Sequence, residues 1–146
     1  LFRSQGTRCR QLAEYVVFES PLNMLCDSPT NYDREEECTE FIATIPTVWE
    51  QTIAMNGEIG KYITMARRKG DVWYVGSLTN WDARTLTLDL SFLGAGRWKA
   101  EMFHDGVNAN RLASDYQKTV TDIPASRKLT VKMAQGGGCA LKIYKE

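Results

Sequence analysis

The sequence predicts a mainly β protein: an antiparallel β-sandwich of about eight strands, preceded by one or two α-helices. Three observations support this. The first 45 residues carry helical patterns, the remainder carries short runs of β-branched and aromatic residues, and glycine, proline or asparagine turns separate those runs. Strands joined by such short turns pair as antiparallel hairpins, and two packed sheets then each bury one face.

The amino-acid composition argues against some classes of binding partner. Lys and Arg together number 18 and so do Asp and Glu, so the net charge is zero. We therefore expect no nucleic-acid partner, because that binding depends on positive charge. We also expect no membrane partner, since no apolar run approaches the ~20 residues that span a bilayer. A neutral oligosaccharide is easier to accommodate.

The start of the chain is helical by pattern. Gly6-Thr7 is a plausible start, and ten of the fifteen residues from Leu12 to Cys26 are apolar and widely spread around the helical period. We expect one helix over Gln5 to Cys26, kinked at Pro21, or two helices that meet near Glu19-Ser20. So apolar a surface predicts a larger neighbouring domain, and we interpret the chain, which starts without Met, as an excised or truncated piece.

A second, shorter helix is predicted from Glu35 to Ile45. Its acidic first turn suits the helix dipole, and Pro46 ends it. The expected domain organisation is therefore a helical segment over residues 1–45 and a sandwich domain over residues 46–146.

Strand patterns begin after Pro46. Thr47 to Met55 is a predicted strand bounded by Asn56-Gly57, with a tight turn at Asn56-Gly57 as the alternative for that boundary. The runs Tyr62 to Ala66 and Val72 to Leu78 predict a hairpin that turns at Gly70. The clearest strand is the next one, whose alternation places four apolar residues on one face: Leu86, Leu88, Leu90 and Phe92. Further strands are expected at Arg97 to Phe103, Tyr116 to Ile123, Lys128 to Ala134 and Cys139 to Tyr144.

The cysteines and the single histidine predict neither a metal site nor a bound cofactor. Cys9, Cys26, Cys38 and Cys139 form no C-x-x-C pair, and His104 is the only histidine. Buried free thiols are expected, with a Cys26–Cys38 bridge as the alternative for an exported protein.

Catalytic motifs are missing from the sequence. No Gly-x-Ser-x-Gly elbow accompanies His104, and Gly136-Gly137-Gly138 lies between two strands, as a turn rather than a phosphate cradle. Among the tryptophans, Trp73 and Trp98 are expected in the core. Trp81 is expected to be exposed, and with Asn80 and Asp82 it forms the candidate substrate-binding set, since an exposed indole can stack on a sugar ring.

Several motifs together carry a family resemblance. They are Gln11-Leu-Ala-Glu-Tyr-Val-Val-Phe-Glu-Ser-Pro-Leu-Asn-Met-Leu-Cys-Asp-Ser-Pro, Ile45-Pro-Thr-Val-Trp-Glu-Gln-Thr, the run from Tyr62 through Ala66-Arg-Arg-Lys-Gly-Asp-Val-Trp-Tyr-Val-Gly, Asp89-Leu-Ser-Phe-Leu, and Phe103-His-Asp-Gly-Val-Asn-Ala-Asn-Arg. With them the sequence resembles the C-terminal portion of the glycoside hydrolase family 97 enzymes, the α-glucosidase and α-galactosidase group.

The resemblance implies a parent enzyme with an N-terminal β-domain, a catalytic (β/α)8 barrel and a C-terminal β-sandwich associated with oligomerisation. Residues 1–45 would then be the last barrel helix or helices. The family's catalytic glutamates and calcium ligands lie upstream of the matched region, so calcium is implied for the parent barrel and no catalytic residue is carried over to this chain. The resemblance also suggests a periplasmic or otherwise exported protein.

The predicted function is a non-catalytic C-terminal accessory or oligomerisation domain of an α-glycosidase. Its expected partners are the missing barrel and, in an oligomer, a second copy of the chain. The alternative is a free-standing carbohydrate-binding module that uses Trp81. The parent's sugar and its retaining or inverting outcome stay open, because the two carboxyl groups that decide them are not in this sequence.

Overall fold

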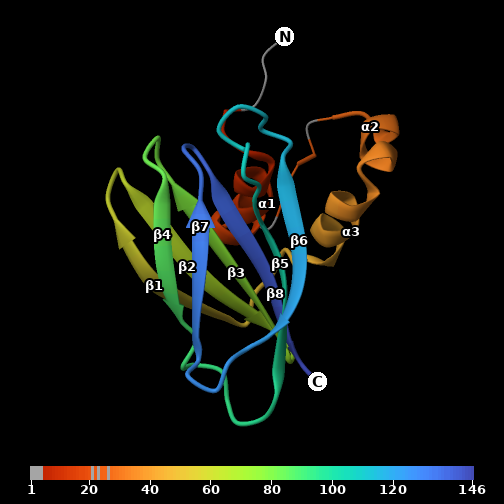
Figure 1. Cartoon of the computed structure of the whole chain (residues 1–146). Helices are drawn as coiled ribbons and strands as arrows, with labels where there is room; N and C mark the ends of the chain where they lie inside the picture. The colour runs from red at the N-terminus through yellow and green to blue at the C-terminus, as the bar shows by residue number, and fades with distance from the viewer. Residues whose placement is uncertain (1–4, 21, 23, 26) are drawn as a thin grey trace.

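The computed structural model describes residues 5–20, 22, 24, 25 and 27–146. It contains eight strands and three helices, and the strands form two antiparallel sheets (Figure 1). The helices are α1 (Arg8–Val17), α2 (Pro29–Arg34) and α3 (Glu36–Thr44). The strands are β1 (Gln51–Glu58), β2 (Tyr62–Lys69), β3 (Val72–Thr79), β4 (Arg84–Asp89), β5 (Trp98–Asp105), β6 (Tyr116–Asp122), β7 (Lys128–Met133) and β8 (Gly138–Lys145). The predicted β-sandwich class is confirmed.

The larger sheet has the strand order β1-β2-β3-β8-β5-β6, and the smaller sheet pairs β4 with β7. Figure 1 shows β4 and β7 in front of the larger sheet and α1 behind it. The larger sheet is therefore the middle layer, covered on one face by two strands and on the other by helices.

The core between the two sheets follows the predicted alternation. Leu88 and Leu90 are fully buried, and Leu86 and Phe92 are partly buried against the same cluster. The strands of the larger sheet add further buried members, among them Trp73, Val75, Trp98, Ala100, Leu141 and Ile143. The prediction that Trp73 and Trp98 fill the core is confirmed.

A second core lies between the larger sheet and the helices. Leu12, Ala13 and Val17 of α1 pack there with Leu78, Phe103 and Ala140 of the sheet. Phe41 of α3 joins them, with its ring centroid 4.7 Å from that of Phe103. This cluster contains residues from both sides of the expected 45/46 domain boundary, which stays a prediction.

The first helix is shorter than predicted. Instead of running from Gln5 to Cys26 it spans Arg8–Val17, and Phe18 is already extended (φ −75°, ψ 134°). A residue that precedes proline avoids helical angles, which disfavours helix at Ser20. The kink expected at Pro21 lies outside the described residues. α1 buries its apolar face on the larger sheet of this same chain.

The hairpin that turns at Gly70 is confirmed, with pairs running from Tyr62 opposite Thr79 to Lys69 opposite Val72. The strand boundary predicted at Asn56-Gly57 is wrong. Both residues lie inside β1, where the register shifts between Ala54 and Asn56. The turn comes later, at Gly60, whose positive φ of 76° suits glycine.

Cys9, Cys38 and Cys139 are buried free thiols, as expected, while Cys26, the alternative partner of Cys38, lies outside the described residues. Burial raises the pKa of the Cys139 thiol to about 12. Within the described part of the chain, no helix is both long and apolar enough to cross a bilayer.

Candidate functional site

The three candidate residues form the tight connection between β3 and β4. This connection lies at the same end of the molecule as the β1–β2 turn and the β7–β8 turn. The backbone N–H of Asn80 donates to the Lys61 carbonyl over 2.7 Å, and the N–H of Gly136 donates to the Asn80 carbonyl over 2.8 Å. Three turns that are far apart in sequence are thereby joined.

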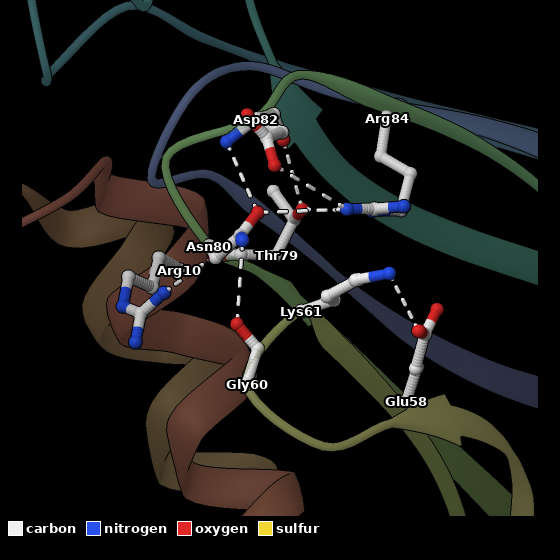
Figure 2. Close-up of polar contacts among 8 residues, drawn as sticks. All are labelled: Arg10, Glu58, Gly60, Lys61, Thr79, Asn80, Asp82 and Arg84. Carbon is white, nitrogen blue, oxygen red and sulfur yellow. Dashed lines mark hydrogen bonds and ion pairs between the residues drawn. The ribbon is translucent and has the colours of Figure 1, made fainter.

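The Asn80 side chain is occupied within the protein. Its Oδ1 accepts the N–H of Asp82 over 3.0 Å and its Nδ2 donates to the Gly60 carbonyl over 3.3 Å, as Figure 2 shows. The first of these bonds, from the N–H two residues further on, closes a local turn that asparagine favours. Asn80 therefore fixes the shape of the connection.

Neighbouring cations strengthen the same connection. Arg10 of α1 donates to the Thr79 carbonyl over 2.8 Å (Figure 2). Arg84 donates from Nε to the Thr79 hydroxyl over 3.2 Å, and another guanidinium nitrogen lies 3.9 Å from an Asp82 carboxylate oxygen. The Asp82 side chain is still 74% exposed. Its carboxylate is therefore accessible to a ligand.

Trp81 is exposed, as predicted, with 63% of its surface accessible to solvent. One edge of its ring lies against the backbone of Gly136: a Cβ added there would be 2.7 Å from Cζ3 of the indole. Gly136 has a positive φ of 62°, so both its conformation and its contact with Trp81 favour glycine. The β7–β8 turn thus packs against one edge of the indole and leaves much of the ring accessible to solvent.

Asp105 is a residue whose role the sequence did not reveal. It is buried, and its Oδ2 accepts the backbone N–H groups of Ala134 (2.8 Å) and Gly138 (3.2 Å). Burial raises the pKa of this carboxyl, while those N–H groups and the Thr7 hydroxyl act in the opposite direction. Asp105 holds the glycine turn in place, and the turn in turn supports Trp81.

A carboxylate with this set of contacts is structural rather than catalytic. Asp115, in the loop between β5 and β6, is also used internally, since its Oδ2 accepts the N–H of Asn108 over 2.7 Å. Glycoside hydrolysis requires two carboxyl groups that face each other across an accessible cleft. These two carboxylates instead bind backbone N–H groups of their own chain.

Comparison with known proteins identifies the family. Residues 48–144 match the family described as glycosyl-hydrolase 97 C-terminal, oligomerisation. The chain belongs to this family. A retaining α-galactosidase from Bacteroides thetaiotaomicron is 60% identical over 140 residues, which are 96% of this chain and 21% of that protein.

Solved structures agree with the assignment to family 97. A glycoside hydrolase family 97 enzyme from Pseudoalteromonas sp. strain K8, solved in complex with acarbose, superposes with a TM-score of 0.92 at 39% identity. The match covers 97% of this chain and 23% of that enzyme. A β-arabinopyranosidase matches with a TM-score of 0.80 at 26% identity over 94% of this chain and 21% of its own.

The chain spans about a fifth or less of the length of its curated relatives. It corresponds to their C-terminal accessory portion, as the resemblance predicted. The recognised family and the accessory class are therefore confirmed. The substrate-binding set of Trp81, Asn80 and Asp82 stays a prediction.

Proposed function

We propose that this chain is the non-catalytic C-terminal domain of an α-galactosidase of glycoside hydrolase family 97. The observation that carries the proposal is the 60% identity to a retaining α-galactosidase across nearly the whole chain, which accounts for only 21% of that protein. Hydrolysis would then be performed by the remainder of the parent enzyme.

The first proposed partner is the parent's catalytic barrel. Four large apolar side chains are exposed after α1, which supports an apolar neighbour: Phe18 (54%), Leu22 (75%), Met24 (79%) and Leu25 (47%). They lie between α1 and α2, so along the chain the order is helix, exposed apolar side chains, helix. That order is the one that repeats in a (β/α)8 barrel. We therefore infer that residues 8–44 contribute to the barrel.

The second proposed partner is another subunit, in agreement with the oligomerisation role that describes the matched family. A full-length enzyme carrying this chain tests it by sedimentation, with and without residues 48–144. We expect the intact enzyme to be an oligomer and the deleted form to be a smaller species. An unchanged oligomer after deletion would contradict the role in assembly.

Calcium, which the resemblance implies for the parent, is proposed to bind outside this chain. Asp105 and Asp115 carry oxygens suited to a hard cation, but both already accept backbone N–H groups in this fold. Export to the periplasm is proposed on the resemblance alone.

A catalytic assay separates this proposal from an independent enzyme. The isolated chain should not hydrolyse aryl α-galactosides or aryl α-glucosides above a blank, and turnover would overturn the non-catalytic assignment. The exposed Trp81 favours the second candidate, a free-standing carbohydrate-binding module. Such a module should give a saturable change in tryptophan fluorescence when oligosaccharides are titrated into the isolated chain.

A further inference from the structure

The first turn of α1 lies at the same end of the sandwich as the β3–β4 connection that contains Trp81. The N–H of Thr7 donates to the Gly136 carbonyl over 3.1 Å, and the N–H of Arg8 donates to the Ala113 carbonyl over 2.7 Å. Arg10 adds the 2.8 Å bond to the Thr79 carbonyl. The start of α1 is therefore fixed to the turns around Trp81, while its last residue, Val17, is bound by Arg67 at 3.0 Å.

The direction of α1 gives the orientation of this end relative to a barrel. In a (β/α)8 barrel each helix starts at the face formed by the carboxyl ends of the strands, and active sites lie on that face. If α1 is a barrel helix, as the proposed function states, its first turn lies on the catalytic face. In Figure 1, α2 lies at the upper end of the molecule above α3, as expected for a second helix that starts at the same face.

The surface around Trp81 suits a neutral, hydroxyl-rich ligand. An indole offers a flat apolar face for the C–H groups of a pyranose ring. Asp82 and Gln135, the latter adjacent to the supporting Gly136, are exposed polar side chains next to it. Because Asn80 and Gly136 hold the connection in one shape, little ordering is needed on binding.

We propose that Trp81 is an accessory sugar contact beside the mouth of the parent's active site, where it stacks on a distal residue of an oligosaccharide substrate. This inference rests on the proposed function, since the active site belongs to the remainder of the enzyme. Asn80 and Asp105 are positioning residues for Trp81, and Asp82 contributes polar contacts at its edge.

The test compares substrates of two lengths in the full-length enzyme. With Trp81→Ala, we expect kcat/KM for a tetrasaccharide to fall about three- to tenfold, the scale of one aromatic contact, mainly through a higher KM. Hydrolysis of an aryl monoglycoside should be unchanged, because it does not reach the distal position. Ile59→Ser in the neighbouring β1–β2 turn is the matched control, since Ile59 is a fully exposed apolar side chain. It should leave both substrates unaffected.

Three outcomes would overturn the inference. Unchanged kinetics of Trp81→Ala on the tetrasaccharide would mean that the ring makes no sugar contact. An equal loss on both substrates would mean a structural role. A change of oligomeric state in both Trp81→Ala and Ile59→Ser would mean that this end of the sandwich is a protein interface. The proposed function fails separately, if deletion of residues 48–144 leaves the oligomer intact.

Discussion

At the scale of single residues, the most informative side chain is Asp105. It links β5 to the β7–β8 turn through two backbone N–H groups, and its carboxyl also interacts with the Thr7 hydroxyl at the start of α1. A buried carboxylate is costly unless it is hydrogen-bonded, and these bonds partly offset that cost.

Asp105 predicts a pH dependence of stability. Its pKa is raised by burial, so its stabilising contribution is fully present below the unfolded pKa of about 3.9 and is lost as pH rises through the folded pKa. Asp105→Asn removes this titration. The free energy of unfolding of the variant, measured by urea titration, should therefore decline less than that of the wild type as the pH rises above about 4.

Asp89 is a control, because the pKa of its carboxyl is shifted in the opposite direction to that of Asp105. The N–H of Ser91 lowers the pKa of this exposed carboxyl, so its contribution is present above the unfolded pKa and is lost on acidification. Asp89→Asn should remove a small gain in stability with rising pH. An Asp105→Asn variant that keeps the wild-type pH profile would contradict the structural role of Asp105.

At the scale of elements, the docking of α1 on the sheet is fixed along its length. The β7–β8 turn binds its first turn, β3 contacts its middle, and Arg67 of β2 donates to the carbonyl of Val17 at its end. Desolvation lowers the pKa of Arg67, the expected effect of burying a cation. A guanidinium at a helix C-terminus also interacts favourably with the helix dipole.

Gly76 of β3 lies close to α1, so a substitution there tests how closely the helix packs on the sheet. A Cβ there would lie 2.8 Å from the Ala13 carbonyl oxygen and 3.0 Å from the Cβ of Val16. Gly76→Ala should therefore push α1 away from the sheet and cost about 1–3 kcal/mol of unfolding free energy in urea titration. Gly94→Ala is the matched control, because an added Cβ meets none of the described atoms within 4 Å. Equal stabilities of the two variants would contradict close docking of α1.

At the scale of the whole molecule, the second core raises the question of where the folding unit begins. The family match starts at residue 48, but Leu12, Ala13 and Val17 cover one face of the larger sheet. Removing the helices would expose Leu78, Phe103 and Ala140 on that face. Their burial is a favourable term that the shorter unit would lose.

A truncation measures that loss. The fragment 46–146 should unfold at a lower urea concentration than the complete chain and bind an apolar dye, while the fragment 5–146 should retain the full midpoint. Equal midpoints for all three forms would mean that the helical segment is energetically separate, in agreement with the 45/46 boundary.

Most strands could be predicted because their determinants are local. The alternation from Leu86 to Phe92 and the hairpin at Gly70 depend on side-chain period and turn chemistry, which are written in consecutive residues. The prediction failed at Asn56-Gly57, where a good turn pair lies inside β1. There the pairing with β2 outweighed the local preference.

The candidate site was predicted only in part. An exposed Trp81 among polar neighbours followed from its place between two strands. Its support by Gly136 and the anchoring of that turn by Asp105 did not, because these contacts join segments more than 25 residues apart.

The sequence by itself determined the family, the β-sandwich class and the exposure of Trp81, since each rests on motifs or on periodicity along the chain. Only the tertiary structure decided that α1 covers the second face of the larger sheet and that its first turn meets the Trp81 end. The packing of α1 on the sheet and the hydrogen bonds that hold the β7–β8 turn join residues that are far apart in the sequence. A pattern of neighbouring residues does not predict such contacts.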